Sequence, residues 1–268
     1  MIKSNYHTHS TFCDGKDSIE EIVKSAIEKG FKYLGFSIHS YINGDDSWTL
    51  KENGLPKYVS EVLRVKEKYK TQISIFLGIE QDTLSSKYDY DFDYVIGSMH
   101  SVEKNGRNYS IDHGIESFKH LLEKVYLGNF DSLCRDYFEQ LKNLFAKTKA
   151  DIVGHFDLIT KFIEVLHLSL PKNYLIYAEK AIIEIIQKVK VFEINTGAMA
   201  RGYRKSPYPS KEILELILKH GGEIMINSDC HDKGYLDYGL EQAQELAKEV
   251  GFTKQVIYTD KGFEMVEL

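Results

Sequence analysis

Short runs of apolar, β-favouring residues alternate with amphipathic segments along almost the whole chain, and this alternation limits the folds available to it. Strand-like runs are expected near residues 4–7, 33–38, 73–79, 94–99, 151–154, 191–195 and 223–228. Between them apolar residues recur at helical spacing, as at Ile19, Ile22, Val23, Ala26 and Ile27. Strands that alternate with helices pair in parallel, and the helices pack outside the sheet. The pattern therefore predicts an α/β protein with a parallel sheet.

The spacing of these repeats favours a closed sheet over an open one. They recur evenly, and the chain has no Gly-rich nucleotide loop of the Walker A or GxGxxG type. A (β/α)7 barrel of TIM type therefore fits better than an open nucleotide-binding sheet. We expect one domain over residues 1–268, with a helical insertion at about residues 104–150 between the fourth and fifth strands.

The composition of the chain limits which binding partners and which cellular compartment we expect for the protein. The 268 residues include 34 Lys and Arg against 40 Asp and Glu, for a formal net charge of −6. No nucleic acid or anionic membrane is therefore expected as a partner. No apolar stretch approaches the ~20 residues of a membrane span, and the N-terminus lacks the apolar core of a signal peptide. Three widely spaced cysteines without a CxxC pair predict a reducing, cytoplasmic setting.

Histidine and carboxylate side chains collect at the ends of the predicted strands. Six of the ten histidines do so, together with Glu80 and Asp229; the six are His7, His9, His39, His100, His155 and His231. Because all parallel strands of a barrel end at the same mouth, we expect these side chains to converge. Imidazoles and carboxylates are ligands of zinc, manganese and iron. So many of them predict two or three ions, an arrangement that suits phosphoryl transfer.

Three basic residues lie in the loops that follow the fifth and sixth strands. They are Lys161, Arg201 and Arg204. Arginine and lysine bind phosphate oxygens, so each of the three is a candidate for holding a phosphate group at the mouth.

The remaining polar residues near the strand ends have more than one interpretation. Asp14 follows His9 in a loop and is a ligand candidate because of its neighbours. Glu193 could orient a ligand or could be a polar group at the end of the core. By strand alternation Cys230 is expected to point away from the mouth and to be a packed residue. The other histidines are expected at the surface or in packing; they are His113, His120, His167 and His220.

Six ordered motifs resemble those of the polymerase-and-histidinol-phosphatase (PHP) family. They are YHTHS at 6–10, FSIHS at 36–40, GIE at 78–80, DYVIGSMH at 93–100, GHFD at 154–157 and NSDCH at 227–231. The resemblance extends over almost the whole chain. Within the family, the chain is similar to the monofunctional enzymes that act on histidinol phosphate.

The resemblance implies a distorted (β/α)7 barrel with three divalent metal ions at the C-terminal ends of its strands. Zinc is the first expectation, and manganese or iron are alternatives. For the first ion it implies the ligands His7, His9, Glu80 and Asp229. For the second it implies Glu80, His100 and His155, and for the third Asp14, His39 and His231. Many family members have a histidine where this chain has Asp14.

The same resemblance implies hydrolysis of L-histidinol phosphate to L-histidinol and phosphate, a step of histidine biosynthesis. Lys161, Arg201 and Arg204 are expected to hold the phosphate, and Asp229 or His231 to transfer protons. Three alternatives remain open. They are a PHP phosphoesterase acting on nucleotides or nucleic-acid ends, a metal-binding regulatory or storage module, and an amidohydrolase-like enzyme.

Overall fold

Seven parallel strands form a nearly closed barrel in a computed structural model, which describes residues 2–45 and 47–268. Their order is β1 (Ser4–Asn5), β2 (Tyr33–Phe36), β3 (Ser74–Asp82), β4 (Tyr94–Ser98), β7 (Ile152–Val153), β8 (Val191–Asn195) and β9 (Glu223–Asn227). A parallel bridge between Thr8 and Cys230 joins the last strand to the first. The predicted distorted (β/α)7 barrel is therefore confirmed.

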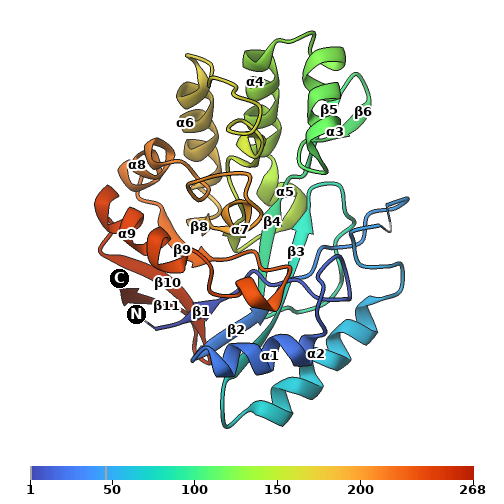
Figure 1. Cartoon of the computed structure of the whole chain (residues 1–268), viewed down its shortest axis with the longest axis vertical. Helices are drawn as coiled ribbons and strands as arrows, with labels where there is room; N and C mark the ends of the chain where they lie inside the picture. The colour runs from blue at the N-terminus through green and yellow to red at the C-terminus, as the bar shows by residue number, and fades with distance from the viewer. Residues whose placement is uncertain (1, 46) are drawn as a thin grey trace.

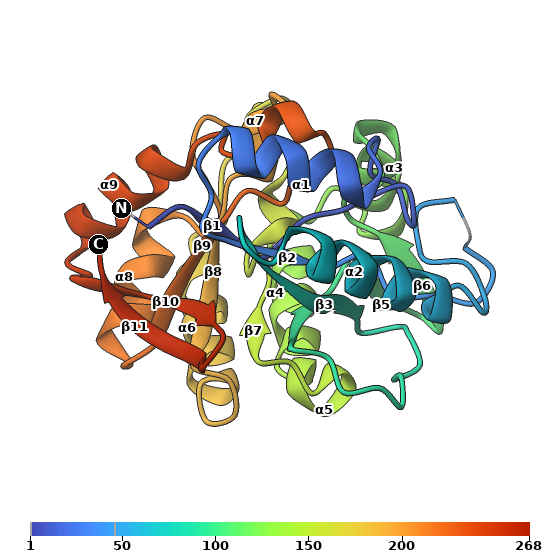
Figure 2. The ribbon, with the colours of Figure 1, turned by 90° about the horizontal axis from the view of Figure 1, so that it is seen from below.

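Helices cover the outside of the barrel (Figure 1, Figure 2). They are α1 (Ile19–Glu28), α2 (Leu55–Tyr69), α3 (Ile115–His120), α4 (Phe130–Leu141), α5 (Leu144–Thr148), α6 (Tyr174–Ile185), α8 (Lys211–Lys219) and α9 (Leu240–Val250). The short α7 (Gly197–Ala200) instead lies at the C-terminal end of β8, next to Asp229. In α1, Ser18 and Glu21 form a reciprocal capping box, and the apolar stripe predicted from the sequence is buried. Within the described residues, no helix is both long enough and apolar enough to cross a membrane.

The chain between β4 and β7 begins with a hairpin rather than with a helix. Strands β5 (Ser101–Lys104) and β6 (Arg107–Ser110) pair antiparallel. Asn105 and Gly106 form the turn between them, with φ of 54° and 76°. Because Asn-Gly favours a two-residue turn of this kind, the prediction of a helical segment from about residue 104 was wrong at its start. The helices α3, α4 and α5 follow.

The N-terminal ends of the barrel strands surround an apolar layer that we call the barrel floor. It consists of Tyr6, Tyr33, Phe76, Tyr94, Ile96, Ile152, Val191, Met225, Val256 and Ile257. The last two belong to β10 (Lys254–Thr259), which pairs with β11 (Gly262–Glu267) in a separate antiparallel hairpin. Figure 1 and Figure 2 both show this hairpin beside the two chain ends. The floor closes the N-terminal end of the barrel, so we expect a functional site at the C-terminal ends of the strands.

Candidate metal centre

The C-terminal ends of the strands bring histidines and carboxylates from six segments of the chain together. Donor atoms of three sets lie within 4.8 Å of one another: His9, Asp14, His39 and His231; His7, His9 and Asp229; and His39, Glu80 and His100. The strand order explains the convergence, because each of these residues lies at or just beyond the end of a barrel strand, except Asp14, which lies in the loop between β1 and α1.

The first group of donor atoms surrounds Glu80 Oε2. From this oxygen, His7 Nε2 lies at 3.3 Å and His9 Nε2 at 3.6 Å. Asp229 Oδ1 lies 3.7 Å and 3.3 Å from the same two nitrogens. Ligands around a tetrahedral zinc ion, each bonded at 2.0–2.2 Å, are roughly 3.3–3.6 Å apart. The four side chains therefore have the spacing of one metal-ligand set.

The second group uses the other oxygen of the same carboxylate. Glu80 Oε1 lies 3.0 Å from His155 Nε2 and 3.4 Å from His100 Nε2. Because its two oxygens face different imidazoles, the Glu80 carboxylate can bridge two ions.

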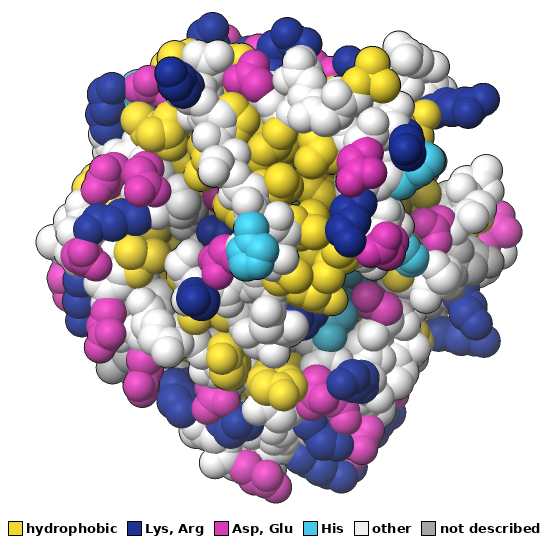
Figure 3. Space-filling model, turned by 45° about the horizontal axis from the view of Figure 1, so that its top comes forward, with side chains coloured by type: hydrophobic (Ala, Val, Ile, Leu, Met, Phe, Trp, Pro, Cys, Tyr) yellow, Lys and Arg dark blue, Asp and Glu magenta, His cyan; other side chains and the backbone are white. Residues whose placement is uncertain are grey.

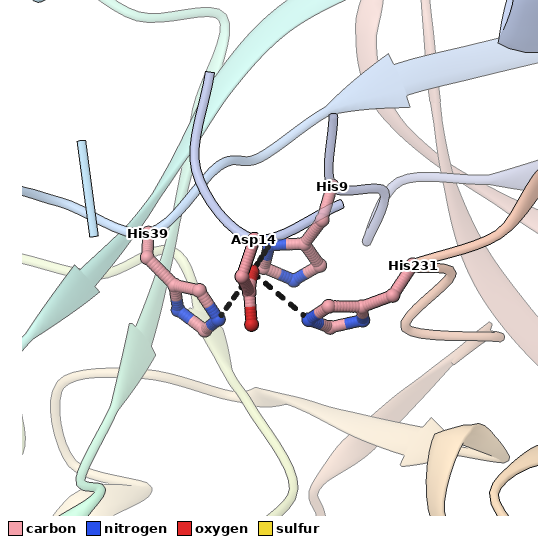
Figure 4. Close-up of side chains that lie close together, drawn as sticks. All are labelled: His9, Asp14, His39 and His231. Carbon is pink, nitrogen blue, oxygen red and sulfur yellow. Dashed lines mark ion pairs between the residues drawn. The ribbon is translucent and has the colours of Figure 1, made fainter. Parts of the chain in front are cut away.

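The third group is centred on Asp14 and is drawn in Figure 4. Asp14 Oδ1 lies 3.3 Å from His231 Nε2, 3.6 Å from His39 Nε2 and 4.0 Å from His9 Nδ1. The carboxylate points between three rings that come from three different parts of the chain. Asp14 therefore stands among imidazoles, as the sequence argument expected of a ligand candidate.

Several buried donor atoms at the centre have no hydrogen-bond partner among residues 2–45 and 47–268. They include His7 Nε2, His9 Nε2 and Glu80 Oε2, which all face one another in the first group. Leaving a buried polar atom unpaired costs about 1–3 kcal/mol, so three such atoms at one point indicate a missing ligand. A divalent cation satisfies all three at once, and the donor set of imidazole and carboxylate suits zinc, manganese or iron.

Two further carboxylates orient imidazole rings by hydrogen bonding to the ring nitrogen that faces away from Glu80. Glu193 Oε1 lies 2.7 Å from His7 Nδ1, and Asp82 Oδ2 lies 2.8 Å from His100 Nδ1. In both rings the hydrogen bond occupies Nδ1 and turns Nε2 toward Glu80, as is usual for metal-bound histidines. Of the two interpretations of Glu193, the structure supports the orienting one. Sequence reasoning missed Asp82, although strand alternation places it on the same face as Glu80.

The charges around the imidazoles shift their pKa values in opposite directions. Burial alone would lower the pKa of His7, but Glu193, Glu80 and Asp229 raise it well above its ordinary value. Burial, together with the neighbouring His231 and His39, lowers the pKa of His9 well below its ordinary value. The first ring lies in a negative field that attracts cations, and the second stays neutral, which is the form that binds metals.

A cavity of about 510 Å³ opens over these groups. It is lined by Asp14, His39, Asp45, Trp48, His100, Ser101, Ser110, Asp112, His113, His155, Leu158, Lys161, Arg201, Tyr203, Asp229 and His231. Figure 3 looks toward this end of the molecule and shows histidines flanked by acidic and basic side chains. The cavity thus joins the metal-ligand groups to two of the three cations predicted to bind phosphate.

Arg201 is held at the edge of the ligand groups. Its Nη2 lies 3.0 Å from Asp229 Oδ2, and its Nη1 lies 3.1 Å from His231 Nδ1. Asp229 adopts φ of 49°, in the left-handed region that few residues other than glycine occupy. A Cβ on Gly197 would lie 2.7 Å from the Asp229 carboxylate and 2.8 Å from the Arg201 guanidinium. Glycine at this position therefore makes room for the ion pair.

Lys161 reaches the cavity from the loop after β7. Its Nζ donates to the Asp112 carbonyl oxygen at 2.9 Å and lies 3.3 Å from Asp112 Oδ2. Burial would raise the pKa of Asp112, but Lys161 and the nearby imidazoles lower it to about 2. The Asp112 carboxylate is therefore ionised beside the ligand atoms, and it opposes the lowering of the Lys161 pKa by burial.

Arg204 does not face the cavity, and the expectation that it binds phosphate is corrected by the structure. Its guanidinium donates to Thr160 Oγ1, lies 3.9 Å from Asp157 Oδ2 and sits 4.6 Å above the Tyr208 ring. The fully buried Asp157 carboxylate supplies the physical reason, because a buried carboxylate requires a cationic partner. Arg204 therefore joins two loops below the cavity.

Eight residues that sequence reasoning did not place in the site also line the cavity. Among them are Asp45, Trp48, Asp112 and His113. The ring of Trp48, the chain's single tryptophan, lies 4.7 Å from that of His39 and 5.2 Å from that of His100. All four lie in loops without periodicity, so no pattern in the sequence indicated them. His113, expected at the surface or in packing, is exposed and borders the cavity.

The chain belongs to the PHP domain family, which it matches over residues 5–197. The protein of Schizosaccharomyces pombe described as "Probable histidinol-phosphatase" is 28% identical, over 92% of this chain and 86% of its own length. The histidinol-phosphatase of Bacillus subtilis is 22% identical, over 90% and 98%. The structure of Lactococcus lactis histidinol phosphate phosphatase with zinc, L-histidinol and phosphate has a TM-score of 0.72 at 21% identity, over 98% of this chain and 99% of that one.

Proposed function

We propose that this protein hydrolyses L-histidinol phosphate to L-histidinol and phosphate. The observation that carries the proposal is the meeting of three imidazole and carboxylate groups with Lys161 and Arg201 in one cavity. Such a site combines metal ions with cations that bind phosphate oxygens, as phosphoryl transfer requires. The choice of substrate is supported by relatives named for this activity, which match at least 90% of the chain.

The residues fit three divalent ions, for which we propose zinc. One ion would be held by His7, His9, Glu80 and Asp229, a second by Glu80, His100 and His155, and a third by Asp14, His39 and His231. Zinc is favoured by the mixture of imidazole and carboxylate donors at tetrahedral spacing. When bound, such ions polarise phosphate oxygens and lower the pKa of water toward about 7.

The two cations at the cavity would orient the substrate. Lys161 offers a point charge, and the planar guanidinium of Arg201 offers parallel N–H groups to two phosphate oxygens. Arg201 is already fixed by Asp229 and His231, so it binds phosphate without first being ordered. Both cations also neutralise the charge that builds up on the phosphoryl oxygens in the transition state.

Asp229 and His231 are the proposed proton-transfer groups. Burial would raise the pKa of Asp229, but Arg201 and His7 lower it well below its usual range, so the carboxylate is ionised. While Oδ1 faces the first ligand group, Oδ2 faces Arg201 and can accept a proton from the attacking water. His231 Nδ1 lies 3.4 Å from Asp229 Oδ1 and accepts from Arg201, so it is unprotonated; it can take up this proton from Asp229 and relay it to the departing alcohol. The phosphoryl group goes directly to water, and no side chain is phosphorylated.

The experiment is a comparison of kcat/KM among phosphate esters with metal content measured on the same sample. The substrates are L-histidinol phosphate, a nucleoside monophosphate and a 3′-phosphorylated oligonucleotide. We expect L-histidinol phosphate to be preferred by about 100-fold or more, the equivalent of about 2.7 kcal/mol. A preference for either nucleotide substrate, or metal-replete protein that hydrolyses none of the three, would contradict the proposal.

A further inference from the structure

Tyr94 lies inside the barrel, beneath the ligand groups, and is fully buried at the start of β4. Its hydroxyl lies 2.5 Å from the carbonyl oxygen of Tyr6 and 3.2 Å from that of Phe36. Tyr6 directly precedes His7, and Phe36 is the last residue of β2, three positions before His39. One side chain therefore contacts the backbone of two segments that carry ligand candidates.

Strand pairing does not fix the backbone of Tyr6. The β1–β2 ladder ends where Asn5 pairs with Leu34, and the next bridge joins Thr8 to Cys230. Between these points the Tyr6 N–H donates to Asn227 Oδ1 at 2.8 Å, and its carbonyl accepts from the Tyr94 hydroxyl. Side chains thus take the place of the ladder at the residue that precedes His7.

Two glycines of the neighbouring strands make room for the Tyr94 ring. A Cβ on Gly35 would overlap with the Tyr94 hydroxyl oxygen, and a Cβ on Gly78 would overlap with the ring carbon that carries it. Gly35 lies in β2 and Gly78 in β3. The ring is therefore confined between two strands, and its hydroxyl has little freedom to leave the Tyr6 carbonyl.

We propose that Tyr94 is a positioning residue for the metal centre. Its hydroxyl donates its one hydrogen to the Tyr6 carbonyl, with the Phe36 carbonyl as a longer contact, and so fixes the direction of the segment that carries His7 and His9. The His7 and His9 Nε2 atoms then meet Glu80 and Asp229 at the spacing of a metal-ligand set. This inference rests on the metal centre proposed above and concerns how its geometry is held, whatever the substrate.

The test compares Tyr94→Phe with the matched variant Tyr6→Phe. The Tyr6 hydroxyl donates to the Tyr258 carbonyl at 2.6 Å in the barrel floor, away from the ligand groups. Each variant loses one buried hydrogen bond from a hydroxyl to a backbone carbonyl, so we expect similar, modest decreases in Tm. Only Tyr94→Phe is expected to weaken zinc binding, by about tenfold or more, in competition between the holoenzyme and a chelator of known affinity.

Wild-type zinc affinity in Tyr94→Phe, or an equal loss in Tyr6→Phe, would overturn the inference. If Tyr94→Phe does not fold, Gly35→Ala provides the same test, because the added methyl group displaces the hydroxyl while the tyrosine remains. A similar loss of zinc affinity in Gly35→Ala supports the inference, and unchanged affinity overturns it. Zinc-binding wild-type protein that does not hydrolyse L-histidinol phosphate contradicts the proposed function and leaves this comparison intact.

Discussion

The two ends of the barrel are built from the same strands, yet they differ in whether their buried polar atoms have hydrogen-bond partners. In the floor, the buried Tyr6 hydroxyl is paired, because it donates to the Tyr258 carbonyl. At the opposite end His7 Nε2, His9 Nε2 and Glu80 Oε2 are buried without a hydrogen-bond partner in the part of the chain that the structure describes. The floor has the satisfied packing of a core, whereas the mouth holds donor atoms that only a ligand would satisfy. Changes in the floor away from Tyr94 should therefore affect stability, and changes at the mouth should affect metal binding and turnover.

The largest effect is expected from Glu80→Gln at the mouth. The substitution removes one of the two carboxylate oxygens that face His7 and His155. We expect kcat/KM for L-histidinol phosphate to fall by about 1,000-fold or more, and metal content to fall with it, because two proposed ions share this side chain. Steady-state kinetics and elemental analysis on the same sample check both effects.

Glu267→Gln is the matched control, since this glutamate lies on β11 and pairs with Lys254 at the surface, 3.4 Å away. Its kcat/KM and metal content should remain those of the wild type. Full metal content in Glu80→Gln would contradict the claim that the mouth, and not the floor, binds the metal ions.

A floor substitution should show the reverse pattern. Ile257 is 2% exposed in β10, and Ile257→Ala leaves a cavity beneath the barrel. We expect the free energy of unfolding to decrease by about 3 kcal/mol, measured by urea denaturation of the holoenzyme. The kcat/KM of the folded variant should stay within about twofold of the wild type. A large loss of kcat/KM in folded, metal-replete protein would show that the two ends are coupled.

A comparison of Lys161 with Arg204 tests which basic side chains belong to the mouth. Lys161→Met removes a cation from the cavity, and we expect kcat/KM to fall by about 10- to 100-fold with little change in metal content. Arg204→Met removes the partner of the buried Asp157, so the larger effect there should be on Tm. Equal losses of kcat/KM in the two variants would contradict the separate placements of these side chains.

The smallest expected effect concerns pH. Imidazole binds a metal only after it loses its proton, and an ordinary histidine does so near pH 6.5. Lowering the pH from about 8 to about 6 should therefore weaken zinc binding by about tenfold or more, because protons compete for the ligand nitrogens. Chelator competition at the two pH values measures the change. Equal affinities would indicate that imidazoles do not dominate the ligand set.

Much of the mouth could be predicted from the sequence because a parallel barrel places all strand ends on one side. This rule was sufficient for His39, His100 and His155, which are far apart in the chain. It also applied to Asp82, which follows Glu80 at the two-residue spacing of one strand face and was overlooked.

The sequence did not reveal how the loops are placed. Asp112 and Trp48 reach the cavity from segments without periodicity, and only the folded chain brings them there. Arg204 was misplaced because its position in a loop at the mouth was visible, whereas the buried carboxylate of Asp157 that attracts it was not. Asn105 and Gly106 did signal the hairpin that begins the insertion, and the helical interpretation passed over them.

The most direct test of a metal centre built from distant residues is anomalous X-ray diffraction from crystals of the zinc-loaded protein. The account predicts three anomalous peaks at the C-terminal ends of the strands. Two of them should lie within bonding distance of the Glu80 oxygens, and the third should lie beside Asp14. Fully loaded crystals with no anomalous peak within bonding distance of Glu80 would contradict it.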